Sequence, residues 1–336
     1  MKKESILLTG GLGFIGSHTA VALKNHFKYI VVIDDLSNST MNSFYRLKHL
    51  VGDNLIFYKA DIACQNQVDL IISSHNIKTV IHYAGLKAVG ESVSFPAKYY
   101  YKNVYSSKLF FDVLKKNKVS NLIFSSSATV YGKPLYLPLD EIHPVRATNP
   151  YGQNKIDIEQ MIFNDTYFQD HCSVKILRYF NPIGAHPSGL IGEDPKGIPN
   201  NIMPIILKVA AKEYKELKIF GNDYLTHDGT GVRDYIHIMD LVEGHVQALG
   251  YDDAGIKILN LGTGQGFSVL DLVHTFQDVN KIKIPYSYGA RRTGDIDCVY
   301  ANPDRAKTIL GFRASQSLQN MCLDAWNFVK KKNKCF

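Results

Sequence analysis

The chain has 336 residues, of which 45% are hydrophobic and 21% charged, a composition typical of a globular protein with a large core and not of a disordered chain. Its net charge of +7 comes without an Arg/Lys-rich arm, which disfavours nucleic acid as a partner. The amino-terminal apolar run is too short for a membrane span or signal peptide, and five scattered cysteines match neither a metal site nor a disulfide framework. We therefore expect a cytoplasmic protein with no metal and no membrane partner.

A glycine-rich turn follows the first predicted strand. Ile6-Leu7-Leu8 is short and apolar, and Thr9-Gly10-Gly11-Leu12-Gly13-Phe14-Ile15-Gly16 leads from it into an amphipathic helix predicted over Ser17 to His26. Glycines in such a turn allow close backbone approach to a pyrophosphate, whose charge the amino end of the helix favours. Because the turn stands between a strand and a helix, it predicts a dinucleotide site rather than a merely structural turn.

The second predicted strand, Tyr29 to Ile33, ends at Asp34, 18 positions after Gly16. A carboxylate near this spacing accepts hydrogen bonds from an adenosine ribose, and it would repel a 2′-phosphate. The stretch from Asp35 to Met41 contains no Arg or Lys to hold such a phosphate. The pattern therefore favours NAD over NADP, with a loop-capping carboxylate as the alternative.

Two further strands are predicted over Asn54–Ile62 and Thr79–Gly85. Asp61 closes the first and suits either an adenine amino group or the cap of the following helix. The second ends in small residues that allow close backbone approach, and Lys87 beyond it could reach phosphate or ribose. His82 lies within an apolar strand, so we interpret it as a core residue.

Helices are predicted between the strands, over Gln65–His75, Pro96–Asn117 and Tyr151–Phe168. Asn103 lies in the second helix, which we expect to cross the cofactor side; an ordinary surface Asn is the alternative. The alternation of strands and helices predicts an α/β fold with a doubly wound parallel (Rossmann) sheet.

The stretch after the fifth strand, Asn121 to Phe124, carries candidate catalytic groups. Ser125-Ser126-Ser127 lies at the carboxyl end of this strand, where open α/β sheets place their ligands. Tyr151 and Lys155 are four residues apart and share a helix face. A neighbouring ammonium and a positively charged nicotinamide ring favour a Tyr phenolate, and Ser127 can relay or orient a substrate hydroxyl. Tyr-x-x-x-Lys alone also arises by coincidence, so the prediction depends on the rest of the chain.

A second lobe is predicted after the strand Val174–Phe180, where the loop-rich segment Gly184–Asn201 interrupts the regular alternation. We assign residues 1–181 to an NAD-binding Rossmann domain, to which elements from about 234 to 262 are candidates for returning. Residues 182–336 form a smaller C-terminal α/β substrate-binding lobe. Its predicted elements are a helix over 205–212, strands over 217–221 and 256–261, a turn followed by a strand within 228–237, and a helix over 239–249.

Polar side chains in the second lobe suit a nucleotide sugar. Guanidinium groups match phosphate oxygens, while Asn amides and a carboxylate match uracil or sugar hydroxyls. Each residue alone is more simply an ordinary surface contact, and only the set favours a binding site. The set comprises Asn181, Asn200, Asn201, Arg233, Arg292 and Asp295.

Several motifs resemble a known family. Thr9-Gly10-x-x-Gly13-x-x-Gly16, the Ser127/Tyr151/Lys155 trio and Tyr179-Phe180-Asn181-Pro182 are similar to the extended short-chain dehydrogenases. Longer strings narrow the resemblance to the UDP-glucose 4-epimerase (UDP-galactose 4-epimerase) family, from about Ile6 to Trp326. They are the strings Ala84 to Ser92, Ser125 to Gly132, Gly197 to Asn201, Gly221 to Tyr224 and Gly229 to His237.

The resemblance implies a homodimeric enzyme with a tightly held NAD, in which the helices Pro96–Asn117 and Tyr151–Phe168 are the interface candidates. Tyr151 would take the proton of the sugar 4-hydroxyl, Ser127 would bridge to the 4-oxygen, and Lys155 would hold the ribose. Hydride would pass from sugar C4 to the nicotinamide and return to the opposite face of a transient 4-keto sugar.

The resemblance and the glycine turn together give the expected binding residues. Those expected to contact NAD are Gly10, Gly13, Phe14, Ile15, Gly16, Asp34, Asp61, Ile62, Tyr83, Ala84, Gly85, Lys87, Asn103, Ser125, Tyr151, Lys155 and Phe180. Those expected to contact the UDP-sugar are Lys87, Ser127, Tyr151, Asn181, Asn200, Asn201, Ile219, Phe220, Arg233, Tyr235, Arg292, Asp295 and Val299.

One position departs from the family pattern. Members confined to glucose and galactose often carry a Tyr four residues after the Asp that matches Asp295, and Val299 stands there in this chain. The smaller side chain predicts room for a 2-acetamido group, hence activity on UDP-GlcNAc and UDP-GalNAc, unless another residue fills the space.

Two other functions are weighed against the 4-epimerase. A nucleotide-sugar 4,6-dehydratase would need an Asp-Glu pair beside the catalytic hydroxyl, whereas Ala128-Thr129 follows Ser127. A non-catalytic NAD-binding regulator would be expected to have lost part of the trio, which is intact.

Overall fold

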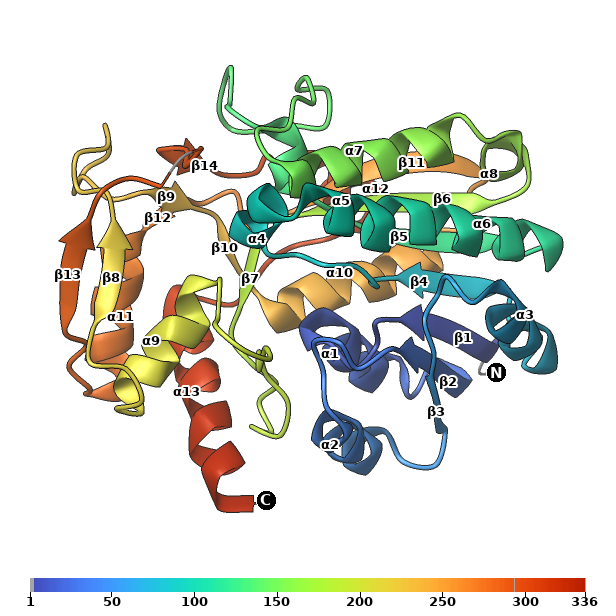
Figure 1. Cartoon of the computed structure of the whole chain (residues 1–336), viewed down its shortest axis with the longest axis horizontal. Coiled ribbons are helices and arrows are strands. Elements are labelled where there is room, and N and C mark those ends of the chain that lie inside the picture. The colour runs from blue at the N-terminus through green and yellow to red at the C-terminus, as the bar shows by residue number, and fades with distance from the viewer. Residues whose placement is uncertain (1–2, 293, 336) are drawn as a thin grey trace. The chain divides into compact units, whose positions relative to one another are not determined.

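The computed structural model describes residues 3–292 and 294–335, which form two compact units (Figure 1). The first contains the chain up to Gly132, Pro144–Arg178 and Val242–Leu259; the second contains Lys133–His143, Tyr179–Leu241 and the chain from Asn260 onward. The sequence analysis placed 133–143 in the first domain. The structure groups it with the second, because the Leu139 amide donates to the Tyr300 carbonyl at 3.0 Å and the Asn302 amide donates to the Leu139 carbonyl at 2.6 Å.

A seven-stranded sheet in the order β11-β6-β5-β4-β1-β2-β3 forms the centre of the first unit and confirms the predicted doubly wound α/β fold. Parallel register joins β3, β2, β1, β4 and β5. The inner strands β5 and β6 are buried along nearly their whole length because helices cover both faces of the sheet. The strands are β1 (Lys3–Thr9), β2 (Phe27–Asp34), β3 (Leu55–Lys59), β4 (Thr79–His82), β5 (Asn121–Ser127), β6 (Ser173–Tyr179) and β11 (Gly255–Leu261).

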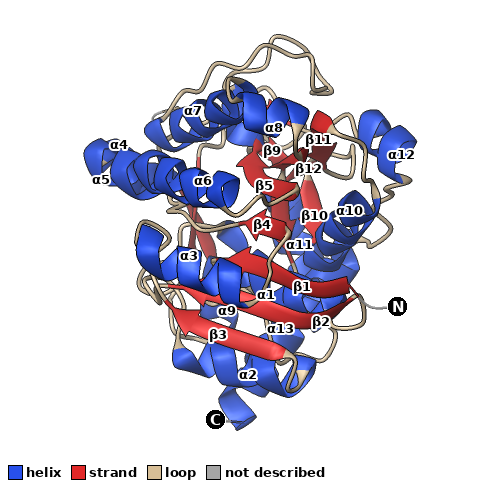
Figure 2. Ribbon diagram, turned by 90° about the vertical axis from the view of Figure 1, so that its right-hand side faces the viewer, coloured by secondary structure: helices blue, strands red, loops and turns tan. Residues whose placement is uncertain are grey.

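Helices cover the sheet in two layers, with α3, α6 and α7 on one face and α1 and α2 on the other (Figure 2). The core under the first layer is built from aliphatic and aromatic side chains such as Phe110, Leu114 and Ile158. The helices are α1 (Phe14–Leu23), α2 (Met41–Val51), α3 (Gln65–Ser74), α4 (Val89–Ser94), α5 (Pro96–Tyr99), the π-helical turn η1 (Tyr100–Tyr105), α6 (Ser106–Lys116), the 3₁₀ turn η2 (Ala128–Tyr131), α7 (Pro150–Phe163), α8 (Thr166–Asp170) and α10 (Ile238–Gly250).

Three predicted helices differ from the observed ones. The helix after the glycine turn begins at Phe14 rather than Ser17, and it is buried along most of its length instead of amphipathic. The helix predicted over Pro96–Asn117 contains the π-helical turn η1 between α5 and α6. The helix predicted over Tyr151–Phe168 ends at Phe163, because the Asp165 side chain accepts a hydrogen bond from the Tyr167 amide and starts α8.

The second unit contains short strands and four helices of its own among the described residues. Its core gathers around α9, α11 and α13, with Ile206, Phe276 and Met321 fully buried. Sequence periodicity missed most of its short strands. Its elements are β7 (Asn181–Ile183), α9 (Ile202–Ala210), β8 (Leu217–Phe220), β9 (Val232–Arg233), β10 (Tyr235–His237), β12 (Phe267–Ser268), α11 (Val269–Asn280), β13 (Tyr286–Gly289), β14 (Cys298–Val299), α12 (Asp304–Leu310) and α13 (Leu318–Cys335).

Across the described ranges, no helix combines the length and the apolar character needed to cross a bilayer.

Candidate active site

The glycine turn after β1 brings backbone segments closer together than side chains would allow. A Cβ on Gly10 would lie 2.9 Å from the Ala84 amide nitrogen, and one on Gly16 would lie 2.7 Å from the Gly11 Cα. No side chain caps the helix α1, which begins directly after Gly13. The amide groups of its first turn therefore suit an anion, so the turn fits a pyrophosphate.

Asp34 lies at the end of β2, as expected, and its carboxylate joins two loops. It accepts hydrogen bonds from the Leu12 amide of the glycine turn at 3.1 Å and from the Leu36 amide at 2.9 Å and the Ser39 hydroxyl at 2.8 Å. Burial raises the pKa of Asp34, and these hydrogen bonds oppose the shift. A carboxylate oxygen accepts more than one hydrogen bond, so Asp34 can hold the loops and still bind a ribose hydroxyl.

Asp61 follows β3 and does not cap the next helix, which corrects one of the two expectations for it. The first position before α3 is Cys64, and Asp61 instead accepts from the Ala63 amide at 2.9 Å and from Lys102 Nζ at 2.6 Å. Burial opposes its ionisation, but these hydrogen bonds outweigh burial and lower the pKa of Asp61. Lys102 also lies 3.7 Å from Asp35, so its ammonium offsets the negative charges of both Asp35 and Asp61, although it lies far from them in the sequence. Sequence analysis missed it.

Asn103 is buried in the π-helical turn, so the alternative of an ordinary surface Asn is wrong. Its Oδ1 accepts from the Leu86 amide at 2.7 Å, and its Nδ2 donates to the Leu86 carbonyl at 3.0 Å. A Cβ on Gly85 would lie 3.1 Å from the same Oδ1. Asn103 thus fixes the loop after β4, in which Tyr83, Ala84 and Gly85 were expected to approach the cofactor; Lys87 lies on its exposed part.

His82 is a core residue, as predicted. It is 1% exposed and bonds to the Thr9 hydroxyl at 2.7 Å and the Ser107 hydroxyl at 2.9 Å. Burial, together with the charge of Lys155, lowers the pKa of His82 to about 3. The ring is therefore neutral, and it braces β1, β4 and α6 beneath the site.

Ser127, Tyr151 and Lys155 come together in the first unit. Ser127 ends β5, and its hydroxyl accepts from the Thr129 amide at 3.2 Å and hydrogen bonds to Tyr151. The Asn149 side chain caps α7 by accepting from the Gly152 amide at 2.9 Å, which sets the first turn that carries Tyr151. Lys155 Nζ donates to the Ser125 carbonyl at 2.6 Å and lies 5.8 Å from the centre of the Tyr151 ring.

In the protein alone, burial outweighs the groups that favour the Tyr151 phenolate, so the net shift of its pKa is upward. Burial raises the pKa of Tyr151 to about 12, although the hydrogen bond from Ser127 opposes the shift. Burial also lowers the pKa of Lys155 to about 8, with the charge of Glu159 opposing it. Desolvation dominates both groups, so a further positive charge is needed to favour the phenolate.

In the second unit, Arg233 and Val299 pair in the parallel register of β9 and β14, and the buried carboxylate of Asp234 lies next to Arg233 in the chain. Asp234 is fully buried and accepts from the amides of Thr263, Gly264 and Ala301 and from the Thr263 hydroxyl, at 2.6–3.1 Å. Its own amide donates to the Val299 carbonyl at 3.0 Å. The role of Asp234 was not predicted from the sequence, because its hydrogen-bond partners Thr263, Gly264 and Ala301 lie far from it in the chain.

Other residues expected to bind substrate already have partners in the second unit. Arg292 pairs with Asp295 at 2.9 Å and lies over the half-exposed Phe220 ring, and Asn201 donates to Glu193 at 2.6 Å. Backbone pairing joins Asn181 to Tyr235, and the Asn200 side chain is exposed. Ile219 and Tyr235 are each 2% exposed in the hydrophobic core, which leaves them only backbone contacts to offer a ligand, and Phe180 is also buried.

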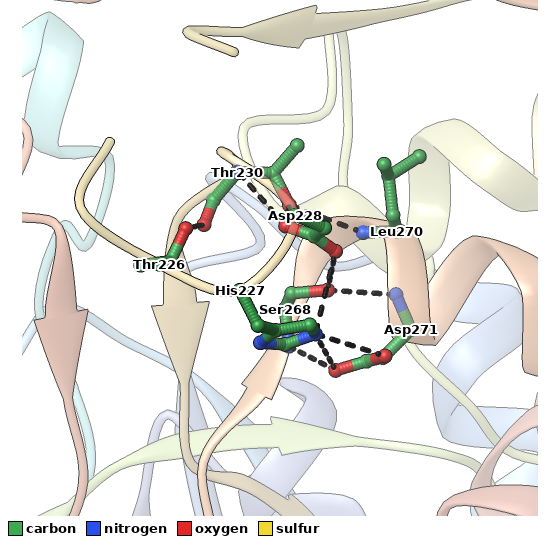
Figure 3. Close-up of polar contacts among 7 residues, drawn as sticks. All are labelled: Thr226, His227, Asp228, Thr230, Ser268, Leu270 and Asp271. Atoms are coloured by element: carbon green, nitrogen blue, oxygen red, sulfur yellow. Dashed lines mark hydrogen bonds and ion pairs between the residues drawn. The ribbon is translucent and has the colours of Figure 1, made fainter. Parts of the chain in front are cut away.

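Three metal-ligating groups, His227, Asp228 and Asp271, have ligand atoms within 4.8 Å of one another (Figure 3). The carboxylates serve the start of α11. Asp271 accepts from the Ser268 amide at 2.8 Å, the Ser268 hydroxyl donates to Asp228, and the Thr230 amide donates to Asp228 at 2.8 Å. We therefore assign this cluster to helix capping.

Comparison with known proteins agrees with this geometry. The model of the NAD dependent epimerase/dehydratase family matches residues 6–262. The chain belongs to this family. It is 49% identical over 326 residues to the UDP-glucose 4-epimerase of Bacillus subtilis (strain 168), covering 96% of each chain, and 50% identical over 333 residues to that of Pasteurella multocida (strain Pm70), covering 98% of each.

Solved structures show the same architecture. The crystal structure of UDP-glucose 4-epimerase from Bifidobacterium longum in complex with NAD+ and UDP matches with a TM-score of 0.94 at 42% identity. The match covers 99% of this chain and 100% of that one. The family and the fold are thus established for the whole chain.

Replacing Asn103 with Leu tests its role in holding the loop after β4. The variant leaves the partly buried amide and carbonyl of Leu86 without the Asn103 side chain as their partner, so we expect the free energy of unfolding to fall by about 2–4 kcal/mol. Denaturant unfolding of the first unit, followed by amide exchange at β4, measures the loss. The exposed neighbour Lys108→Ala is the control, with an expected change within about 0.5 kcal/mol. A similar small change for Asn103→Leu would contradict the role.

Proposed function

We propose that this chain is an NAD-dependent UDP-glucose 4-epimerase, an isomerase that interconverts UDP-glucose and UDP-galactose. The observation that carries the proposal is the occurrence of the glycine turn and the Ser127/Tyr151/Lys155 trio at the carboxyl edge of one sheet. Relatives of that name match nearly the whole chain at 49–50% identity.

NAD is the cofactor. The glycine turn with Phe14 and Ile15 would hold its pyrophosphate, Asp34 its adenosine ribose, and Asp61 and Ile62 its adenine. The loop Tyr83–Gly85, with Asn103 behind it, would support the nicotinamide half, together with Lys87, Ser125, Lys155 and Phe180. When bound, NAD takes a hydride from sugar C4, carries it while its ring is uncharged, and returns it to the opposite face.

The residues of the trio divide the proton handling among them. Tyr151, as a phenolate, takes the proton of the sugar 4-hydroxyl and later returns it. Ser127 shares a hydrogen bond with Tyr151 and bridges it to the 4-oxygen. Lys155 supplies one of the two positive charges that offset burial of Tyr151, whose pKa is about 12 in the protein alone. The oxidised cofactor would supply the second charge.

The second unit supplies groups for the UDP portion. Arg233 and Arg292 suit the two phosphates, because guanidinium groups match phosphate oxygens. Asn181, Asn200, Asn201 and Asp295 supply amides and a carboxylate for uracil or sugar hydroxyls, while Phe220 offers a half-exposed ring and Ile219 and Tyr235 offer backbone. Lys87, exposed in the loop after β4, is a further candidate for binding a phosphate or ribose.

The alternative functions fit less well. A 4,6-dehydratase needs an acid and a base beside the catalytic hydroxyl, and Ser127 is followed by the 3₁₀ turn Ala128–Tyr131, which carries no carboxylate. A non-catalytic regulator has no need for Lys155, a buried ammonium held at 2.6 Å on the Ser125 carbonyl. The intact trio favours catalysis.

Substituting Tyr151 by Phe tests the proton role. We expect epimerisation to fall about 10²- to 10⁴-fold, because the variant cannot exchange the 4-hydroxyl proton. The measurement is product analysis after purified protein, without added NAD, is given UDP-galactose. Bound NAD, released by denaturation and quantified, is the control and should equal that of the unmodified chain. Undiminished turnover would remove Tyr151 from the base role.

We further propose that the enzyme accepts 2-acetamido sugars, because Val299 is smaller than the Tyr found at this position in stricter relatives. Val299 belongs to β14, whose backbone is fixed by pairing with β9 and by the Asp234 amide. The side-chain volume at position 299 therefore sets the space, since the strand cannot easily retreat.

Val299→Tyr tests the space beside the sugar. We expect kcat/KM for UDP-GalNAc to fall by roughly tenfold to 200-fold, because the larger ring takes the room of the acetamido group, while UDP-galactose is little affected. Val299→Ala is the matched control and should retain both activities. Equal activity of Val299→Tyr on both sugars would disprove the pocket argument.

We propose that the chain forms a homodimer through α5, η1, α6 and α7. Phe95, Tyr100 and Tyr101 are each more than half exposed on this side, and Tyr101 stacks on Tyr105 at 5.2 Å. A hollow of about 590 Å³, lined from Pro96 to Tyr100 and from Ala147 to Asp157, lies beside them. Exposed aromatic side chains around a hollow are typical of an interface.

Tyr101→Glu places a charge on this aromatic surface and should convert a dimer into a monomer in sedimentation velocity. Tyr45→Glu, on an exposed Tyr of α2, is the control and should sediment as the unmodified chain does. An unmodified chain that sediments as a monomer would contradict the proposal.

A further inference from the structure

The helix α7 carries a second buried ionisable residue, Glu159, one turn beyond Lys155. Tyr151, Lys155 and Glu159 are spaced four apart and share one helix face. Lys155 is 6% exposed and Glu159 is 3% exposed. A carboxylate buried so deeply requires strong partners, because leaving it unpaired costs several kcal/mol.

Glu159 joins α7 to two strands. Its Oε1 accepts from the Ser126 hydroxyl at 2.5 Å and from Arg178 Nε at 3.0 Å, and its Oε2 accepts from Arg178 Nη2 at 2.6 Å. Ser126 stands in β5 between Ser125, which holds Lys155, and Ser127, which bonds to Tyr151. Three consecutive residues of the strand are thus each held by a different turn of the helix.

Arg178 extends the same network to the turn after β5. Its guanidinium group lies 4.9 Å from the centre of the Tyr131 ring, in the 3₁₀ turn that begins next to Ser127. The bidentate pair with Glu159 fixes the guanidinium plane, because both nitrogens must face the carboxylate. Arg178 therefore braces the turn that positions the Ser127 hydroxyl.

The charge of Glu159 also acts on Lys155. Burial lowers the pKa of Lys155 to about 8, and the Glu159 carboxylate opposes that shift. His82 is neutral, since its pKa is about 3. Among the described residues, ionisable groups face Lys155 and Tyr151 from several elements. Glu159 lies on α7 itself, and His82 lies on β4. The others are Tyr99 of α5, to which Glu91 of α4 is bonded, Tyr131 of η2 and Arg178 of β6.

We propose that Glu159 and Arg178 are positioning residues for the 4-epimerase reaction: their buried pair holds the serine strand end against α7, and the Glu159 carboxylate supports the positive charge of Lys155. This inference rests on the proposed function. Neither residue contacts the reacting atoms; each acts through Ser126, Tyr131 and Lys155.

Glu159→Gln tests the electrostatic part through the pH profile. Lys155 is charged below its pKa and loses its proton above it, and its charge favours the Tyr151 phenolate. Removing the negative charge lowers the Lys155 pKa, so the alkaline limb of kcat should move to lower pH by about one unit. A purely structural loss would lower kcat at every pH without moving the limb.

Two variants separate charge from contact. Ser126→Ala removes a hydrogen bond and leaves the Glu159 charge, so it should reduce kcat while leaving the alkaline limb in place. Glu159→Gln leaves the buried Arg178 without its ion-pair partner, and this variant alone can fail to fold. The double variant Glu159→Gln/Arg178→Met removes both charges and is used in that case. The alkaline limb of kcat for the double variant should also move to lower pH. Retained NAD shows that the first unit is folded.

A second readout does not depend on activity. The carbon-13 shift of Lys155 Cε, assigned by its absence in Lys155→Met, reports the protonation of Lys155 directly. This inference would be overturned if the unmodified enzyme epimerises and the variants leave both the alkaline limb of kcat and the Lys155 titration unmoved. An unmodified chain without epimerase activity, but with a Lys155 titration that moves in Glu159→Gln, would overturn the proposed function and leave the charge coupling standing.

Discussion

Burial of the Lys155 ammonium is the constraint on which the rest of the candidate site depends. An ammonium removed from water is costly unless hydrogen bonds and opposite charges replace its hydration. The Ser125 carbonyl lies 2.6 Å from it and the Phe124 ring centre lies 4.9 Å away, both on β5. The strand end and α7 must therefore stay in register, and that register also brings Tyr151 to Ser127. The geometry that makes a base available follows from keeping a buried cation satisfied.

The cofactor edge is organised by a different constraint, the close approach of backbones. Gly10 lies against the Ala84 amide, and Thr9 accepts a hydrogen bond from that amide at 3.2 Å while bonding to His82. Asn103 then holds the next residues from the π-helical turn. These contacts involve neutral groups and backbone, so this edge can be rigid without carrying charge. Charged side chains lie at the ends of the neighbouring strands, in Asp34 and in the pair that Lys102 forms with Asp61.

The sequence predicted the parts of the site that depend on local spacing. The glycine turn, the acid after β2 and the Tyr151/Lys155 pair are each readable from neighbours within one strand–turn–helix unit, and the core role of His82 follows from its apolar strand. Lys102, Asp234 and Glu159 were missed because their partners are distant in sequence. The π-helical turn was missed because its side-chain pattern continues that of α5 and α6. In the second unit, strands of two to four residues are too short to show a period.

Asp234 explains why the backbone around position 299 is held in place. Its carboxylate accepts four hydrogen bonds from backbone and hydroxyl groups of the segments 263–264 and 301, and a Cβ on Gly262 would lie 2.6 Å from its Oδ2. Moving β14 away from β9 would break the hydrogen bonds that join Asp234 to the Val299 carbonyl and to the Ala301 amide, at about 1 kcal/mol or more for each group left unpaired. A larger residue at position 299 must therefore project into the space beside Arg233 rather than push the strand back. With the strand held in this way, the proposed selection between sugars would depend on the side-chain volume at position 299.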